Sequence, residues 1–214
     1  MTHGRAQLAQ AFFLACRRNH VRPTPLVLAV SVREQVMGVF AKVGHSGQTQ
    51  RLAAPFTSPT FGGPSSRTVQ KRAFPAPPGH YEFRARYLAS TSRFGVGQLA
   101  DSYKTPLGLH RVAIKIGGGQ PIGTVFRNRV PVGLTWCGQP DAPIAHRILW
   151  LEGLERGLNR GGCVDSFRRY IYLHGVGDEM TLGRPASRGC IHLQAKDLIP
   201  LFDLLPIGTL VWIE

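Results

Sequence analysis

Short runs of apolar residues, several of them alternating with polar ones, recur along most of the chain. The run at 25–32 (PLVLAVSV) is apolar and β-branched, and after Arg33 and Glu34 a similar run follows at 35–43, which predicts a β-hairpin. Further strand-like runs lie at 83–89, 112–116, 124–130, 147–151, 169–173 and 209–213. Glycine and proline separate these runs, as turns between antiparallel strands require. We therefore predict a mainly β fold of predominantly antiparallel strands.

One segment near the C-terminal end has helical spacing instead. Over 196–205, the apolar residues Leu198, Ile199, Phe202 and Leu205 fall on one face. Pro200 has no backbone N–H to donate, so it costs a backbone hydrogen bond unless it lies in the first turn of the helix.

The first 24 residues are predicted to form a separate N-terminal helical segment that packs on the domain. Their short apolar run is interrupted by glutamines and followed by two arginines, which is a poor match to a signal peptide. Residues 13–16 (FLAC) are loosely similar to a lipoprotein cleavage box ending at Cys16, but an amphipathic helix explains the same residues. No stretch reaches the about 20 consecutive apolar residues that would cross a bilayer, so we expect no transmembrane segment.

Between about 44 and 80 the composition changes to Ser, Thr, Pro and Gly, as in PFTSPTFGGPSS. Such a stretch buries little apolar surface. We predict that it is a basic insertion, carrying Arg51, Arg67, Lys71 and Arg72, within one domain that covers 25–214. It is either a solvated loop or a tether to an anionic polymer.

The chain is strongly basic, and this charge narrows the choice of partner. It has 26 Lys and Arg against 12 Asp and Glu, a net charge of +14. Nucleic acid, anionic lipid and an acidic cell-wall polymer would all suit such a field. The basic residues are scattered, and no zinc-finger, RNP or helix-turn-helix signature accompanies them. We therefore expect an anionic partner other than nucleic acid.

Candidate chemistry is concentrated in residues 170–193 (YIYLHGVGDEMTLGRPASRGCIHL). A strand-like run ends at His174 and Gly175, and Cys190 follows 16 residues after the histidine, so a loop can bring ring and thiol together. A free thiol has a pKa of about 8.5, and a neighbouring imidazole that takes its proton makes it a nucleophile for acyl transfer. Gly189 allows a tight turn whose N–H groups could face a developing oxyanion.

At these residues the sequence resembles the catalytic domain of L,D-transpeptidases of the YkuD type. That motif has His-Gly, a loop of about fifteen residues and then Ser-His-Gly-Cys, an apolar residue and Arg. His174, Gly175, Ser187, Gly189 and Cys190 match it. The family's upstream Thr-Pro-x-Gly turn matches 105–108 (TPLG), and the resemblance covers 25–214 apart from the insertion.

The resemblance implies an L,D-transpeptidase-type β-sandwich with a few short helices, acting on peptidoglycan stem peptides in the periplasm or cell envelope. Cys190 would form a thioester with a stem tetrapeptide and release D-alanine, and an acceptor amine would resolve the thioester. His174 would be the base, held by the Gly175 carbonyl, while N–H groups of Gly189 and Cys190 would bind the oxyanion. Water as acceptor would make the enzyme an L,D-carboxypeptidase. No cofactor is implied.

Two positions beside the cysteine depart from the family motif, which reads SRGCIHL here. Arg188 replaces a histidine and His192 replaces an arginine. Because arginine keeps its proton, it cannot act as an imidazole would. The alternative hypothesis is therefore a catalytically impaired protein that binds peptidoglycan. We expect Ser187, Arg188, His192 and Arg184 to contact substrate. A zinc site of Cys190, His174 and His192 is disfavoured, since no fourth ligand is evident, and we predict no metal.

Overall fold

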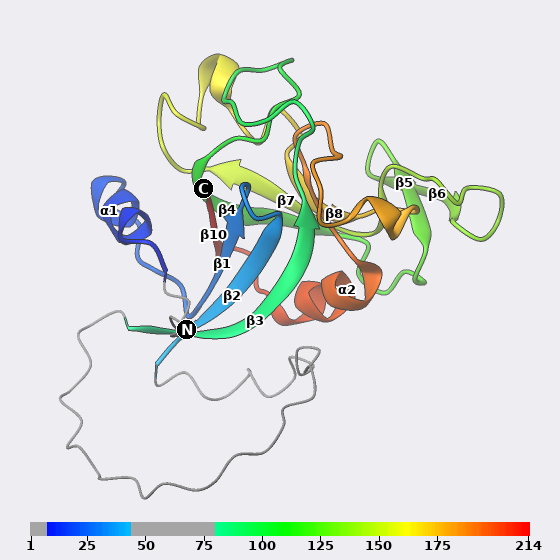
Figure 1. The fold of residues 1–214 in the computed structure, drawn as a ribbon, viewed down its shortest axis with the longest axis horizontal. Helices are drawn as coiled ribbons and strands as arrows, with labels where there is room; N and C mark the ends of the chain where they lie inside the picture. Colours follow the sequence, from blue (N-terminus) through cyan, green and yellow to red (C-terminus); the bar gives the residue numbers. More distant parts are fainter. Residues whose placement is uncertain (1–7, 44–79) are drawn as a thin grey trace, which may run out of the picture.

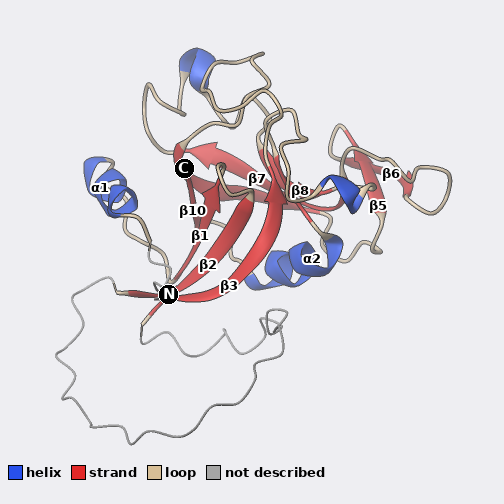
Figure 2. Cartoon of the chain, viewed as in Figure 1, coloured by secondary structure: helices blue, strands red, loops and turns tan. Residues whose placement is uncertain are grey.

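Strands make up most of the regular structure (Figure 2). The computed structural model describes residues 8–43 and 80–214, so the insertion predicted at about 44–80 lies outside the described residues except for His80. The elements are α1 (Gln10–Arg18), β1 (Leu26–Ser31), β2 (Val36–Lys42), β3 (Tyr81–Ser90), β4 (Gly108–Ile116), β5 (Thr124–Arg127), β6 (Val130–Leu134), β7 (Ala145–Gly153), the 3-10 turn η2 (Gly162–Val164), β8 (Tyr172–Gly175), the 3-10 turn η3 (Glu179–Thr181), β9 (Ile191–Leu193), α2 (Ala195–Leu204) and β10 (Leu210–Ile213).

Within the described residues, ten strands form one sheet in the order β4-β10-β1-β2-β3-β9-β8-β7-β5-β6. An additional pairing of β4 with β7 closes the sheet into a barrel-like sandwich, from which the β5–β6 hairpin projects (Figure 1). The β1–β10 and β8–β9 pairs are parallel, and the other pairs are antiparallel. The predicted mainly β, predominantly antiparallel fold is confirmed.

Strand β1 lies between two hydrophobic cores, and its residues are apolar on both faces. Leu26, Leu28 and Val30 pack in the larger core together with α2. Val27 and Ala29 point the other way and pack in a second core with α1. Because successive side chains of a strand face opposite sides, a strand between two cores needs apolar residues at nearly every position.

Helix α1 packs beside the sheet, against β1 and β10 (Figure 1). Phe12, Ala15 and Cys16 are its buried residues. The Phe12 ring makes edge contacts with Tyr81 and Trp212, at centroid distances of 6.5 and 6.4 Å. Helix α1 is therefore part of the second core.

Helix α2 is present, and its proline occupies a position that costs a backbone hydrogen bond. Pro200 is in the second turn rather than the first, because the helix begins at Ala195. The missing hydrogen bond would have gone to the Lys196 carbonyl. Lys196 and Pro200 are both exposed, so water can satisfy that carbonyl, while Leu198 and Leu201 on the buried face anchor the helix.

Two predicted strands are shorter than the sequence pattern suggests. The run at 124–130 is divided into β5 and β6, because Asn128 and Arg129 form the hairpin turn with φ of 51° and 69°. The run at 169–173 starts as a strand only at Tyr172, because Tyr170 has a φ of 56°. Polar or aromatic residues with left-handed backbone angles therefore end these strands, and no glycine in the sequence marks these positions.

Candidate functional site

His174 and Cys190 are brought together by the parallel pairing of β8 and β9. Leu173 is opposite Ile191, and His174 is opposite His192. Cys190 immediately precedes β9, so it lies beside the start of β8. A cleft of about 500 Å³ is lined by both His174 and Cys190. The chain between His174 and Cys190 thus folds back and brings both side chains to one cleft.

The His174 ring is buried and fixed by its own backbone. Its Nδ1 lies 2.8 Å from the Gly175 carbonyl oxygen, and since a carbonyl only accepts, Nδ1 carries the proton and Nε2 is free to act as a base. Burial lowers the pKa of His174 to about 4, although the bond to Gly175 opposes this shift. The ring is therefore neutral at pH 7.

Gly175 is required by the packing around it. A Cβ atom at this position would lie 2.5 Å from Cδ2 of His146 and 2.8 Å from the Ala145 oxygen. His146 cannot move aside, because its Nδ1 accepts from the Gly123 N–H at 2.8 Å and its Nε2 lies 3.1 Å from the Val176 oxygen. The glycine of the His-Gly pair thus lets β8 approach β7 closely.

The Cys190 thiol rests on the backbone that enters β8. The Tyr172 N–H donates to Sγ at 3.4 Å, and the thiol donates to the Tyr170 oxygen at 3.5 Å. Burial raises the pKa of Cys190 to about 11, opposed by the Tyr172 N–H and the charge of Arg169. In the described part of the chain no hydrogen bond joins Sγ to His174. The resting site therefore holds a neutral thiol and a neutral imidazole in one cleft.

The turn before Cys190 is closed by Ser187. Its buried Oγ donates to the Cys190 oxygen at 2.6 Å and accepts from the Gly189 N–H at 3.1 Å. Gly189 has a φ of +114°, and a Cβ there would lie 3.3 Å from Ile171 Cδ1 and the Lys104 oxygen. The expected oxyanion donor at Gly189 is thus engaged within the turn. The Cys190 N–H has no hydrogen-bond partner among residues 8–43 and 80–214.

Arg169 holds the loop that faces this turn, a role that sequence reasoning missed. Its guanidinium donates to three backbone oxygens, at 3.3 Å to Gly97, 2.8 Å to Gln98 and 2.6 Å to Lys104. Its positive charge also opposes the rise in the pKa of Cys190. In the sequence Arg169 could not be told from the neighbouring arginines, because its partners are backbone atoms some 65 to 72 residues away.

The predicted substrate-contacting residues divide into two groups. Ser187, Arg188 and His192 line the cleft, whereas Arg184 is exposed and does not line it. The His192 ring lies 4.7 Å from that of His174, and its buried Nδ1 has no partner in the described residues. Burial and the neighbouring His174 lower the pKa of His192 to about 3.

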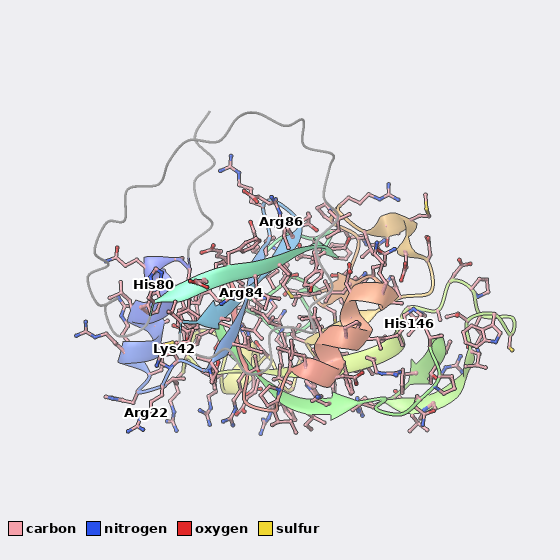
Figure 3. The ribbon with its side chains drawn as sticks, turned by 90° about the horizontal axis from the view of Figure 1, so that it is seen from below. Arg22, Lys42, His80, Arg84, Arg86 and His146 are labelled. Atoms are coloured by element: carbon pink, nitrogen blue, oxygen red, sulfur yellow. The ribbon has the colours of Figure 1, made fainter. Side chains whose placement is uncertain are left out.

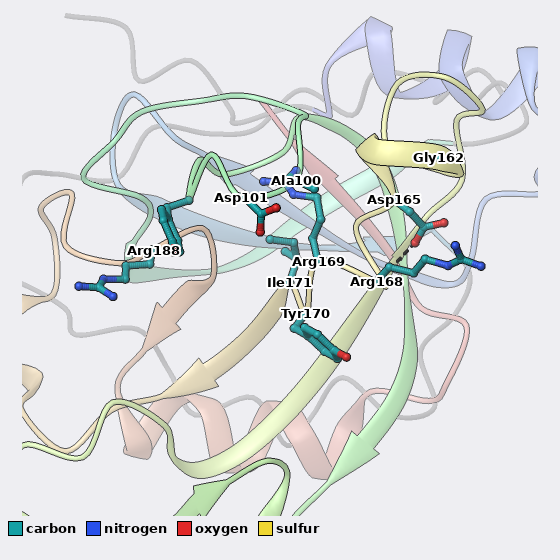
Figure 4. Close-up of a pocket in the computed structure, with 10 residues that line it drawn as sticks. Ala100, Asp101, Gly162, Asp165, Arg168, Arg169, Tyr170, Ile171 and Arg188 are labelled. Atoms are coloured by element: carbon teal, nitrogen blue, oxygen red, sulfur yellow. Dashed lines mark hydrogen bonds between the residues drawn. The ribbon is translucent and has the colours of Figure 1, made fainter.

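Arg188 lies between two hollows of the surface. Its guanidinium lies 5.7 Å from the centroid of the Tyr103 ring. It lines the cleft and also a second pocket of about 200 Å³, which Asp101, Arg168 and Tyr170 line as well (Figure 4). An exposed cation therefore lines the cleft at position 188, where the L,D-transpeptidase motif has histidine.

In the described ranges 8–43 and 80–214, no three His, Cys, Asp or Glu side chains are grouped closely enough to hold a metal ion. No helix of the same ranges has the length and apolarity needed to span a bilayer.

Comparison with known proteins agrees with the motif. The sequence model of the YkuD L,D-transpeptidase catalytic domain matches residues 57–213. A putative L,D-transpeptidase of Bacillus subtilis is 30% identical over 66 residues, which are 28% of this chain and 40% of that protein.

Solved structures were found by similarity of fold. L,D-transpeptidase 3 of Mycobacterium tuberculosis, with a faropenem-derived adduct, is 16% identical over 89% of this chain and 60% of its own, with a TM-score of 0.44. Bd1075 of Bdellovibrio bacteriovorus is 14% identical over 98% of this chain and 51% of its own, with a TM-score of 0.49. The chain thus spans less than two thirds of these proteins. From the match over residues 57–213, the chain belongs to the family of L,D-transpeptidase catalytic domains.

Proposed function

We propose that the protein is a peptidoglycan L,D-transpeptidase of the cell envelope, with Cys190 as nucleophile and His174 as general base. The observation that carries this proposal is the shared cleft, which both residues line. The bond from His174 Nδ1 to the Gly175 oxygen leaves Nε2 as the proton acceptor. Family membership supplies the substrate class, a stem tetrapeptide that ends in D-alanine.

The first half-reaction forms a thioester. Sγ of Cys190 bonds to the carbonyl carbon that precedes D-alanine, and the thiol proton passes to Nε2 of His174. The unpaired Cys190 N–H binds the oxyanion. The C–N bond then breaks, and the imidazolium returns its proton to the departing amine of D-alanine.

The second half-reaction resolves the thioester. A side-chain amine of another stem attacks the acyl carbon and gives a proton to His174, and the C–S bond breaks. The sulfur takes the proton back, and a new peptide bond remains as a cross-link or an anchor to the wall. A neutral base is needed in both steps, and the buried His174 ring, with its pKa lowered to about 4, is neutral at pH 7.

Product analysis on a disaccharide-tetrapeptide tests the proposal. We expect a cross-linked dimer and free D-alanine from the intact protein, and neither from Cys190→Ala or His174→Ala. Cys163→Ser, which changes an exposed thiol, is the matched control and should behave as the unmodified protein does. Tripeptide without dimer would indicate a carboxypeptidase. Unreacted tetrapeptide would contradict the proposal and favour an impaired, peptidoglycan-binding protein.

A further inference from the structure

Two arginines lie side by side at one end of the cleft. Ser92 and Ser187 form a parallel bridge, and the Arg93 N–H donates to the Ser187 oxygen at 3.1 Å. The next residues of both segments, Arg93 and Arg188, are exposed and line the cleft. Each guanidinium lies over an aromatic ring, and neither forms an ion pair with any residue of the described chain.

Two aspartates lie side by side at the other end. The Gly177 N–H donates to the Ala142 oxygen at 2.8 Å, which joins the segment after β8 to the segment before β7. The flanking residues Asp141 and Asp178 are exposed and line the cleft. Asp178 accepts from the Met180 N–H at 2.9 Å through one carboxylate oxygen. Within the described ranges neither aspartate has a cationic partner.

The sheet topology separates these two pairs. The arginines lie where β3 ends and β9 begins, and the aspartates lie where β8 ends and β7 begins. Because β8 and β9 are parallel, these are opposite ends of the central strand pair. Cys190 lies beside Tyr172 at the start of β8, and the aspartates follow Gly175 at the end of the same strand. Three residues of strand, about 10 Å, therefore separate the backbone at Cys190 from the end of β8 that the aspartates follow. The thiol and the imidazole lie between the opposite charges.

We propose that the cleft selects a zwitterionic donor peptide and fixes its direction. This inference rests on the proposed function. Arg93 and Arg188 bind the free carboxylate of the leaving amino acid, since guanidinium groups pair with carboxylates in a bidentate way. Asp141 and Asp178 bind the free ammonium group on the side chain of the residue that is transferred. The arginine at position 188 is thus a specificity-determining residue that keeps its charge where the family's histidine would lose it.

Four synthetic donors test this assignment. One is a tetrapeptide with a diamino acid at position three and a free C-terminal carboxylate; the others carry a C-terminal amide, an acetylated side-chain amine, or both. We expect each modification to lower kcat/KM for release of the last residue about tenfold, the effect of one ion pair of about 1.4 kcal/mol. Amidation should lose its effect in Arg93→Ala and Arg188→Ala. Acetylation should lose its effect in Asp141→Asn and Asp178→Asn.

Matched controls lie away from the cleft. Arg22 is exposed, and Figure 3 shows it at the end of the molecule opposite His146. Asp203 is exposed on α2. Arg22→Ala and Asp203→Asn should keep both tenfold preferences. Preferences that are absent in the unmodified protein, or that persist unchanged in all four cleft variants, would overturn the inference while leaving the proposed function intact.

Alkylation of Cys190 tests the anion-binding role of the arginines even if the proposed function fails. If none of the donors reacts, the proposed function fails, and peptide mapping then compares labelling of Cys190 by anionic iodoacetate and neutral iodoacetamide. We expect the ratio of iodoacetate to iodoacetamide labelling to fall severalfold in Arg188→Ala and not in Arg22→Ala. An equal ratio in these two variants would overturn the anion-binding role of the arginines.

Discussion

Replacing Ser187 by alanine should destabilise the protein through the turn that carries the cysteine. The change removes the hydroxyl that bonds to the Cys190 oxygen at 2.6 Å and to the Gly189 N–H at 3.1 Å, at a residue only 2% exposed. A net hydrogen bond contributes about 1 kcal/mol, and more when a buried partner stays unsatisfied. We therefore expect the free energy of unfolding to fall by about 2 to 3 kcal/mol, which lowers Tm by roughly 4 to 12 °C in a chain of this size.

Urea unfolding at pH 7 measures this loss, and Ser102 provides a matched control. Its hydroxyl donates to the Leu99 oxygen at 2.6 Å and accepts from the Lys104 N–H at 3.3 Å, but in an exposed loop. Water replaces both bonds in Ser102→Ala, so its loss should stay below about 1 kcal/mol. Ser187→Thr keeps the hydroxyl and should recover part of the stability. Equal losses for the two serine-to-alanine changes would refute the reasoning.

Three more predictions concern the same site. Gly175→Ala places a methyl group against His146 and should cost about 1 to 3 kcal/mol of unfolding free energy, measured in urea; an unchanged midpoint would contradict the packing. Arg169→Ala should lower the free energy of unfolding by about 2 kcal/mol or more, because three backbone oxygens lose their donor. It should also slow labelling of Cys190 by iodoacetamide, because the charge of Arg169 opposes the rise in the pKa of Cys190. Arg168→Ala should change neither quantity. Burial lowers the pKa of His110 and His174 to about 4, so the unfolded chain binds more protons between pH 6.5 and 4. The free energy of unfolding should therefore fall by about 3 kcal/mol per ring as the pH drops from 6.5 to 4. A free energy of unfolding in urea that stays constant over this range would be inconsistent with neutral buried rings.

Most of the fold could be predicted from the sequence because its signals are local. The period-two pattern reports burial on one face of a strand, and the apolar run of β1 reports burial on both faces. The strand ends at Asn128, Arg129 and Tyr170 could not be predicted, because the left-handed conformation there is imposed by the tertiary structure and not by glycine.

The candidate site was predictable only in part. His174 and Cys190 stand out through their glycines and their spacing. The backbone groups that hold the thiol and the clamp made by Arg169 leave no trace in residue type. The opposite charges of the cleft arise because segments far apart in the sequence meet where the strands of the sheet end.

Mass spectrometry of the intact protein after incubation with a carbapenem tests the central claim most directly, since carbapenems acylate the nucleophile of this family. We predict one covalent adduct on the unmodified protein and on Cys163→Ser, a slower adduct on His174→Ala and none on Cys190→Ala. An unmodified protein that stays free of adduct, or a Cys190→Ala variant that still acquires one, would contradict the assignment of Cys190 as the acyl acceptor.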